Sequence, residues 1–258
     1  MRADRFALSL ILALAPMAAV AQDTTPDDRI AAALADDRRP AEERERDTAR
    51  HAAETLALAD IQPGDQVADM VMGGGYFTRL FASLVGDEGL VWAWQPQEFV
   101  SFNAEYGHNV IDIDETYRNV AGVIMPFRLF SLPAGEIDVA FTAQNYHDFH
   151  LNPFPEDTAA RVNAAVFTAL RPCGRYVVID HDAAAGSGFS VAHTLHRAEA
   201  RAVQAEIAAA GFELVDSDDF LHRDSDPLTA NVFDPSIRGN TSQFVLVFRK
   251  PGPTCPAG

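Results

Sequence analysis

The stretch VADMVMGGGYFTRLF, residues 67–81, places three consecutive glycines between an apolar run and a segment with helical spacing. A glycine loop between a strand and a helix is the context in which a backbone closely approaches a ligand. Glycine permits positive φ and has no Cβ to block the ligand, and the next helix begins with free N–H groups. The stretch therefore predicts a strand–loop–helix unit with a binding loop, and a tight turn needed only for packing is the alternative.

Strand and helix patterns alternate after this unit. Strand patterns cover residues 66–72, 89–94, 119–125, 136–143, 175–180, 212–220 and 242–250. Helical patterns cover residues 74–85, 96–106, 156–170 and 193–211. The last two strands are joined by the loop 222–241 without a helix, which favours an antiparallel pair. We therefore predict an α/β, Rossmann-like, doubly wound fold: a seven-stranded, mostly parallel sheet with an antiparallel last strand and helices on both faces.

Residues 1–21 have the layout of a cleavable secretory signal. Arg2 and Arg5 precede the apolar run 6–21, which ends in the small-residue triplet Ala19-Val20-Ala21. This run is shorter than the roughly 20 residues of a membrane-spanning helix, so an uncleaved anchor is the less favoured alternative. We expect a periplasmic or secreted protein with no stable membrane insertion after cleavage.

The remaining chain divides at the turn 61–65. The predicted organisation is a signal peptide (1–21), an N-terminal helical extension (22–60), a main α/β domain (61–251) and a tail (252–258). Within the extension, Pro40 separates two predicted helices, 29–37 and 41–59. We expect the charged residues of the second helix to form a solvated face.

The chain is strongly acidic, with 37 Asp and Glu against 20 Lys and Arg and a formal net charge of −17. Such a surface is repelled by nucleic acids and by anionic membranes. The composition therefore excludes a nucleic-acid partner and favours a small-molecule substrate or a protein partner.

The order of elements resembles class I S-adenosylmethionine-dependent methyltransferases, and more narrowly a group of exported bacterial proteins known only as predicted methyltransferases. The residues that carry this resemblance are 69–78, 145–150, 179–188, 194–200, 210–214 and 244–251. The resemblance implies S-adenosylmethionine as cofactor and methyl transfer to an unidentified small acceptor. Because this superfamily shares a cofactor site and little else, the fold is implied more specifically than the catalytic residues.

The resemblance also implies a cofactor-binding role for the glycine loop. Asp69 fills the acidic position of the family pattern, Gly73 and Gly75 fill two of its alternate glycine positions, and Gly74 lies between them. Val71 replaces the first glycine of the pattern. This edge cradles the amino-acid part of the cofactor in the family.

Two further cofactor contacts follow from the resemblance. Gln95 occupies the position at which family members hold the ribose hydroxyls with Asp or Glu. A glutamine can accept one hydrogen bond but lacks the charge that strengthens such contacts. Asn145 and Tyr146 lie where relatives place a residue beside the transferred methyl group, and we expect Tyr146 to line the acceptor site.

Histidines and aspartates gather after the fourth and fifth predicted strands. They are His147, Asp148, His150, Asp180, His181 and Asp182, followed by His193 and His196 in the next predicted helix. The carboxyl ends of neighbouring parallel strands meet at the edge where ligands bind, so these groups should converge there. We also expect His193 and His196, at i and i+3, to share one helix face.

Three interpretations of this cluster stay open. In the first, His147 is a general base oriented by Asp148 or Asp180. The predicted catalytic set is His147, Asp148, Tyr146 and His181. In the second, a divalent metal binds candidates from Asp148, His150, Asp180 and His181, which indicates a metal-dependent hydrolase or lyase. In the third, these residues are hydrogen-bonded loop residues of a non-catalytic binding protein.

The two cysteines, Cys173 and Cys255, flank the predicted strands 175–180 and 242–250. If these strands run antiparallel side by side, the start of one lies near the end of the other. A disulfide could then attach the tail, in keeping with an oxidising compartment, but two unpaired thiols are the favoured interpretation because the sequence does not fix the Cα–Cα distance.

Overall fold

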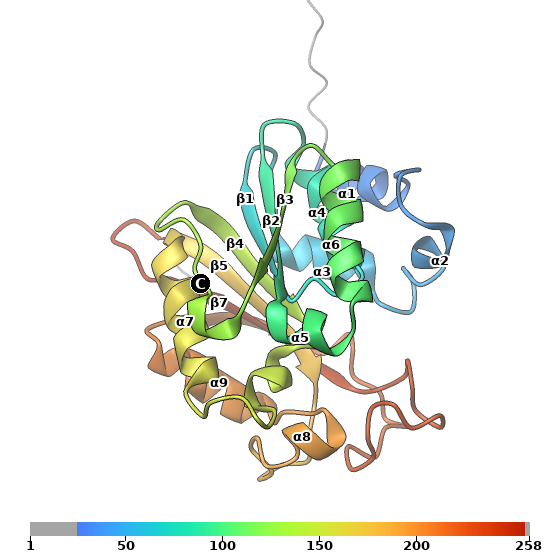
Figure 1. Cartoon of the computed structure of the whole chain (residues 1–258), viewed down its shortest axis with the longest axis vertical. Coiled ribbons are helices and arrows are strands. Elements are labelled where there is room, and N and C mark those ends of the chain that lie inside the picture. Colours follow the sequence, from blue (N-terminus) through green and yellow to red (C-terminus); the bar gives the residue numbers. More distant parts are fainter. Residues whose placement is uncertain (1–24, 256–258) are drawn as a thin grey trace, which may run out of the picture.

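The computed structural model describes residues 25–255, so the predicted signal segment 1–21 lies outside the described residues. Its centre is a mixed sheet of seven strands in the order β3-β2-β1-β4-β5-β7-β6 (Figure 1). The strands are β1 (Gln66–Met70), β2 (Leu90–Pro96), β3 (Val120–Met125), β4 (Ile137–Ala143), β5 (Leu170–His181), β6 (Glu213–Asp218) and β7 (Gln243–Arg249). Strands β1 to β5 pair in parallel, and β7 runs antiparallel to both β5 and β6. The predicted fold class is confirmed.

Helices cover both faces of the sheet. The α-helices are α1 (Pro26–Leu34), α2 (Ala41–Arg44), α3 (Ala52–Ala59), α4 (Tyr76–Val85), α5 (Gln97–Phe102), α6 (Glu105–Thr116), α7 (Thr158–Ala169), α8 (Ala192–Leu195) and α9 (Ala200–Ala209). Two short 3₁₀ helices are η1 (Phe127–Leu129) and η2 (Tyr146–His150). None of the helices between residues 25 and 255 is long and apolar enough to cross a membrane.

Successive strand residues supply two separate cores. In β5, Val177 and Ile179 pack into the core shared with α1, α3, α4 and α6. Tyr176 and Val178 point the other way, into the core shared with α7 and α9. This alternation follows from the period of two along a strand, and burying each such side chain contributes roughly 1.5–3 kcal/mol. Neighbouring residues at the carboxyl end of β5 therefore face opposite sides of the sheet.

The predicted helix over residues 41–59 is wrong. The segment forms α2 and α3, with turns between them and a left-handed residue, His51, before α3. Its charged residues are not a uniformly solvated face, because Glu43 is only 8% exposed and pairs with Arg79, and Asp47 pairs with the buried Arg39 at 2.6 Å. A buried guanidinium must be paired and hydrogen-bonded, and the turns bring the carboxylate and the Leu34 carbonyl to it.

The predicted helix over residues 193–211 is also interrupted. The helix α8 ends before His196, which has a left-handed φ of 55°, and α9 begins at Ala200. His193 and His196 therefore do not share a helix face. The adjacent Arg197 is fully buried and pairs with Asp226 at 2.9 Å, so the break directs this side chain into the protein.

The helix α6 is an element that the sequence patterns did not predict. Its residues 105–116 are mostly polar, and only Val110 and Ile113 supply large buried side chains. Two apolar anchors give a weak helical period, so tertiary packing on β3 and β2 decides the conformation here.

Cys173 and Cys255 form a disulfide with a Cα–Cα distance of 5.3 Å. Because β7 runs antiparallel to β5, the chain leaving β7 passes the start of β5, as the sequence predicted. The disulfide attaches the C-terminal tail at the end of the sheet opposite the glycine loop.

Candidate functional site

The glycine loop connects β1 to α4 at the carboxyl edge of the sheet. Gly73 and Gly75 have φ angles of 59° and 80°, which glycine adopts without strain. A Cβ on Gly73 or Gly74 would meet no atom within 4 Å, so this part of the loop borders open space. A Cβ on Gly75 would lie 1.8 Å from Cδ1 of Ile113, so Gly75 is required for packing against α6.

Contacts within the chain fix this loop. The buried Asp69 accepts a hydrogen bond of 2.5 Å from the Thr78 hydroxyl, and burial raises the pKa of Asp69 to about 6. Asn145 donates both amide hydrogens, to the carbonyl oxygens of Val71 (3.2 Å) and Ala143 (2.6 Å). Asn145 therefore ties the glycine loop to the end of β4.

Gln95 lies at the carboxyl end of β2 and is fully buried. Its Oε1 accepts a hydrogen bond of 2.9 Å from the Gly73 N–H. Its Nε2 is buried and has no hydrogen-bond partner in the part of the chain that the structure describes. A buried donor without a partner costs about 1–3 kcal/mol, so a hydroxyl oxygen of a ligand at this position would relieve that cost.

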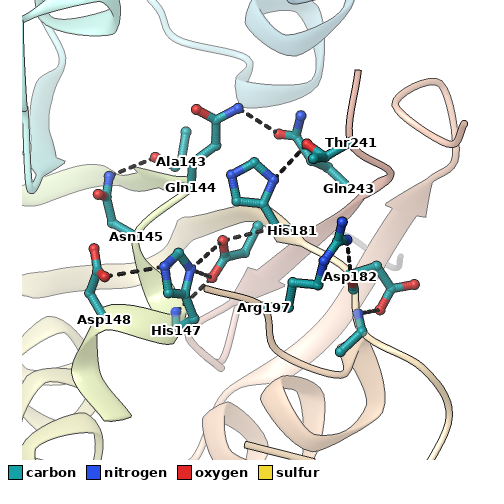
Figure 2. A network of polar contacts seen from close by, with 12 residues as sticks. Ala143, Gln144, Asn145, His147, Asp148, His181, Asp182, Arg197, Thr241 and Gln243 are labelled. Atoms are coloured by element: carbon teal, nitrogen blue, oxygen red, sulfur yellow. Dashed lines mark hydrogen bonds and ion pairs between the residues drawn. The ribbon is translucent and has the colours of Figure 1, made fainter. Parts of the chain in front are cut away.

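His147 lies between two carboxylates (Figure 2). Its Nδ1 is 2.9 Å from Asp180 Oδ1, its Nε2 is 3.2 Å from Asp148 Oδ1, and its backbone N–H donates to Asp180 at 2.6 Å. Burial alone would lower the pKa of His147, but Asp180 and Asp148 outweigh it and raise that pKa to about 10. His147 is therefore an imidazolium at neutral pH, held in one orientation.

His181 is the next residue after Asp180 but points to the opposite face of the sheet. Its Nδ1 is 2.8 Å from the Thr241 hydroxyl oxygen (Figure 2). Burial is the largest cause that lowers the pKa of His181 to about 4, so the ring is neutral at pH 7. At neutral pH His147 is therefore charged and His181 is neutral.

Tyr146 and His150 lie on the α7 and α9 side. The Tyr146 hydroxyl donates to Glu206 at 2.7 Å and accepts from Asn163 at 2.7 Å, and the side chain is fully buried. The Nε2 of His150 is 3.1 Å from Oε2 of Glu206, and its ring stacks on Phe189 with 3.6 Å between the ring centroids. The structure therefore places Tyr146 in the core and not beside an acceptor site, because Asn163 and Glu206 satisfy its hydroxyl there.

One group among residues 25–255 has a geometry that suits a metal ion. Ligand atoms of His147, Asp148 and His196 all lie within 4.8 Å of one another. The predicted set of Asp148, His150, Asp180 and His181 does not converge in this way. Asp180 and His181 point to opposite faces of the sheet.

A cavity of about 400 Å³ lies beside this cluster, at the carboxyl ends of β4 and β5 and the start of β7. It is lined by Arg46, Ala49, Arg50, Thr55, Phe77, Ala143, Gln144, Ile179, His181, Leu221, Val232, Phe233, Arg238, Gly239, Thr241 and Gln243. His181 is the one lining residue that belonged to the predicted site. The Gln144 amide donates to Gln243 Oε1 at 3.1 Å across the cavity edge (Figure 2).

Sequence reasoning missed the arginines and glutamines of this cavity. Arg46 and Arg50 come from the N-terminal extension, and Arg238 comes from the loop between β6 and β7. These segments carry no motif, and their approach to the sheet edge is visible only in three dimensions. Gln144 has a left-handed φ of 65°, a conformation that the sequence around it does not predict.

The likeness of this chain to known proteins lies in its fold. No protein-family model matches the sequence, and no curated protein matches it. Many solved structures match, and methyltransferases are prominent among them. The structure is similar to a SAM-dependent methyltransferase from Aquifex aeolicus, with a TM-score of 0.56 and 15% identity. The match covers 88% of this chain and 100% of that chain.

Two further structures show how broad this likeness is. An arsenic(III) S-adenosylmethionine methyltransferase from Chlamydomonas reinhardtii matches with a TM-score of 0.51 and 16% identity, over 88% of this chain and 74% of that one. The [4+2]-cyclase SpnF matches with a TM-score of 0.55 and 17% identity, over 79% of this chain and 80% of that one. At these identities the comparison shows the class I methyltransferase fold, which hosts more than one reaction.

Proposed function

We propose that the protein binds S-adenosylmethionine at the glycine loop and transfers its methyl group to a small acceptor bound in the adjacent cavity. The observation that carries the proposal is the open space beyond Gly73 and Gly74, on the same sheet edge as the cavity lined by His181. When bound, S-adenosylmethionine supplies an electrophilic methyl group. The chain's own residues would position the two reactants in line.

The residues of the loop fit the cofactor in part. Gly73 and Gly74 would leave room for its amino-acid portion, and the unpartnered Nε2 of Gln95 could donate to a ribose oxygen. Gln95 cannot accept from two hydroxyls as a carboxylate would, because its Oε1 already binds the Gly73 N–H. We therefore expect cofactor binding weaker than an acidic residue at position 95 would give.

Proton transfer is assigned within the predicted catalytic set. His147 already holds its proton at neutral pH, so it acts as a positioning residue rather than as a free base. Asp148, 3.2 Å from His147 on the side of Asn145, does not line the cavity and would hold the imidazolium in place (Figure 2). His181, neutral and in the cavity wall, would hydrogen-bond the acceptor and take its proton.

We also propose that the protein works outside the cytoplasm. The signal-like sequence of residues 1–21 supports export, as does the disulfide between Cys173 and Cys255. Disulfides persist in oxidising compartments and are rare in the cytosol of most organisms.

The test is calorimetric titration of the mature protein with S-adenosylmethionine and S-adenosylhomocysteine. Gly74 has no left-handed φ and a Cβ there meets no atom within 4 Å, so Gly74→Leu should project into the open space, abolish binding and leave the thermal transition in place. Gly74→Ala, the matched control, fills less of the space and should weaken binding by less. Absence of heat up to millimolar concentrations of either compound in the unmodified protein would refute the proposal.

A metal-dependent hydrolase or lyase on the same scaffold is the second candidate. The group His147, Asp148 and His196 favours it, and Asp180 would orient His147 from behind as carboxylates do for metal-binding histidines. The donor set of imidazoles and one carboxylate suits zinc. Elemental analysis of the same sample decides: stoichiometric zinc without cofactor heat would promote this candidate.

A further inference from the structure

The cavity carries a local charge opposite to that of the protein. The chain has 37 acidic and 20 basic residues, yet the cavity wall contains three arginines, one histidine and no Asp or Glu. The arginines are Arg46, Arg50 and Arg238, which come from two segments far apart in sequence. An accumulation of cations in a hollow of an acidic protein requires a specific explanation.

Arg50 lacks the partners that neighbouring arginines have. Arg39 pairs with Asp47, and Arg79 pairs with Glu43. These two pairs engage the nearby carboxylates of the extension. The Nε of Arg50 is buried, and no residue in the described part of the chain accepts a hydrogen bond from it. Its guanidinium lies 4.3 Å from the ring centroid of Tyr76, a contact that fixes its orientation.

The electrostatics of Arg50 point the same way. Burial and the nearby Arg46 lower the pKa of Arg50 to about 10, and Glu43 and Asp69 only partly offset them. Arg50 is partly buried, and a partly buried cation without a hydrogen-bonded counter-ion is unfavourable, so an anion beside it would reduce that cost. An arginine fork suits a carboxylate in particular, because it can donate two parallel hydrogen bonds.

The rest of the wall is apolar with one polar strip. Phe77, Ile179, Leu221, Val232 and Phe233 supply apolar and aromatic surface. Gln144, His181, Thr241 and Gln243 form the polar strip at the strand ends. A volume of about 400 Å³ is that of a pocket for a small organic molecule.

We infer that this cavity binds a small organic acid, with its carboxylate on Arg50 and Arg238 and its apolar body against Phe77 and Phe233. The inference deepens the proposed function and rests on it only in naming this acid as the class of methyl acceptor. Arg46 also lines the cavity and adds to its positive charge, which attracts the anion from a distance.

The experiment compares a charged probe with its neutral counterpart on the mature protein. The probes are indole-3-acetate, indole-3-acetamide and acetate, titrated by calorimetry without S-adenosylmethionine. Indole-3-acetate should bind at least about tenfold more tightly than the amide, because hydrogen bonds to a charged group are the stronger ones. Acetate should bind more weakly than indole-3-acetate, because it lacks the apolar body.

Variants locate the binding. Arg50→Gln and Arg238→Gln should each weaken indole-3-acetate binding about tenfold and leave amide binding unchanged, and Arg50→Lys should restore part of the affinity. Arg201→Gln changes an exposed arginine on α9, outside the cavity, and is the matched control. Since Arg50 also contacts Tyr76, circular dichroism checks its folding, and Arg238→Gln tests the site independently from a loop.

Each outcome decides the inference. The inference would be overturned by equal affinity for the acid and the amide. It would also be overturned if indole-3-acetate did not bind at millimolar concentrations. Competition between indole-3-acetate and S-adenosylmethionine would also overturn it, because the arginines would then hold the cofactor's own carboxylate. If the acid binds as expected and no cofactor heat is seen, the cavity inference stands and methyl transfer fails.

Discussion

The two halves of the carboxyl edge of the sheet differ in which polar groups lack a hydrogen-bond partner. At the β1 and β2 ends, Thr78 satisfies Asp69 and Gln95 satisfies Gly73, and the buried Nε2 of Gln95 has no partner within residues 25–255. At the β4 and β5 ends, Arg50 keeps a buried nitrogen without a partner, and His181 is neutral in the cavity wall. The first half, the platform, leaves a neutral donor for a ligand, and the second half leaves a cationic donor, for which an anion would change the energetics more.

The difference has a structural cause. The platform is built around one continuous stretch, strand β1, the loop and α4, which Gln95, Asn145 and Ile113 hold from adjoining elements. The cavity is assembled from the N-terminal extension, the strand ends and the loop between β6 and β7. A single strand–loop–helix unit packs closely on its neighbours, whereas the three segments of the cavity meet around a space that a ligand can fill.

The largest expected effect lies outside both halves. Replacing Cys173 and Cys255 by Ser removes a cross-link between positions separated by 82 residues, which should lower the free energy of unfolding by about 4 kcal/mol. Because the disulfide attaches the tail at the opposite end of the sheet, cofactor and acid binding should stay unchanged. Urea denaturation and calorimetry of the double variant check both points, and a loss of binding in the folded variant would show that the two ends are coupled.

A second substitution tests the rigidity of the platform. Gly75→Ala forces a side chain into a φ of 80° and against Ile113, which is buried in the core, so it should lower the free energy of unfolding by about 2–4 kcal/mol. Gly74→Ala, one residue away, meets open space and should change it by less than about 1 kcal/mol. Equal effects in urea denaturation would mean that α6 does not pack on the loop as described.

Much of the platform could be predicted from sequence, because its signals are local. The glycines between a strand and a helix indicated the loop, and the missing helix before the last strand indicated the antiparallel pair. The cavity was not predictable in this way. Arg50 lies in a charge-rich segment that a pattern assigns to solvent, and its burial depends on Tyr76 and on turns that interrupt the expected helix.

The predicted histidines and aspartates follow β4 and β5 as the sequence indicated, but they do not meet as one cluster. Sequence position put Asp180 and His181 at the right edge of the sheet. The pleat then sends adjacent side chains to opposite faces, so Asp180 pairs with His147 and His181 faces the cavity. A sequence shows which residues reach an edge, and the register of side chains decides which of them meet.

The pH dependence of stability tests the charged cluster at the border of the two halves. The pKa of His147 is raised to about 10 in the folded protein, against a model-peptide value near 6.5. The folded state therefore keeps a proton that the unfolded state has lost, so stability should fall by about 2 kcal/mol between pH 7.5 and pH 9. Below about pH 6.5 this contribution is fully present.

Urea denaturation at several pH values measures this slope. His147→Gln should flatten it between pH 7.5 and pH 9 while lowering stability at pH 7, because Asp180 would remain buried without its cation. An unchanged slope in the variant would assign the proton to another group. The depressed pKa of His181, about 4, acts only below its ordinary value and leaves this window unaffected.

The smallest expected effect concerns Val71, which stands where the family pattern has its first glycine. Its φ of 61° strains a β-branched residue by about 1–2 kcal/mol, and glycine would relieve that strain. Glycine would also lose the buried side chain, worth roughly 1.5–2 kcal/mol, and add about 0.5–1 kcal/mol of backbone entropy. Val71→Gly should therefore lower the free energy of unfolding by only about 1 kcal/mol, measured by urea denaturation.

Because Val71 packs into the core shared with α7 and α9, the same substitution should change cofactor affinity less than about twofold. A loss above 3 kcal/mol would mean that the valine is not strained, and a large gain in cofactor affinity would mean that its side chain narrows the cofactor space.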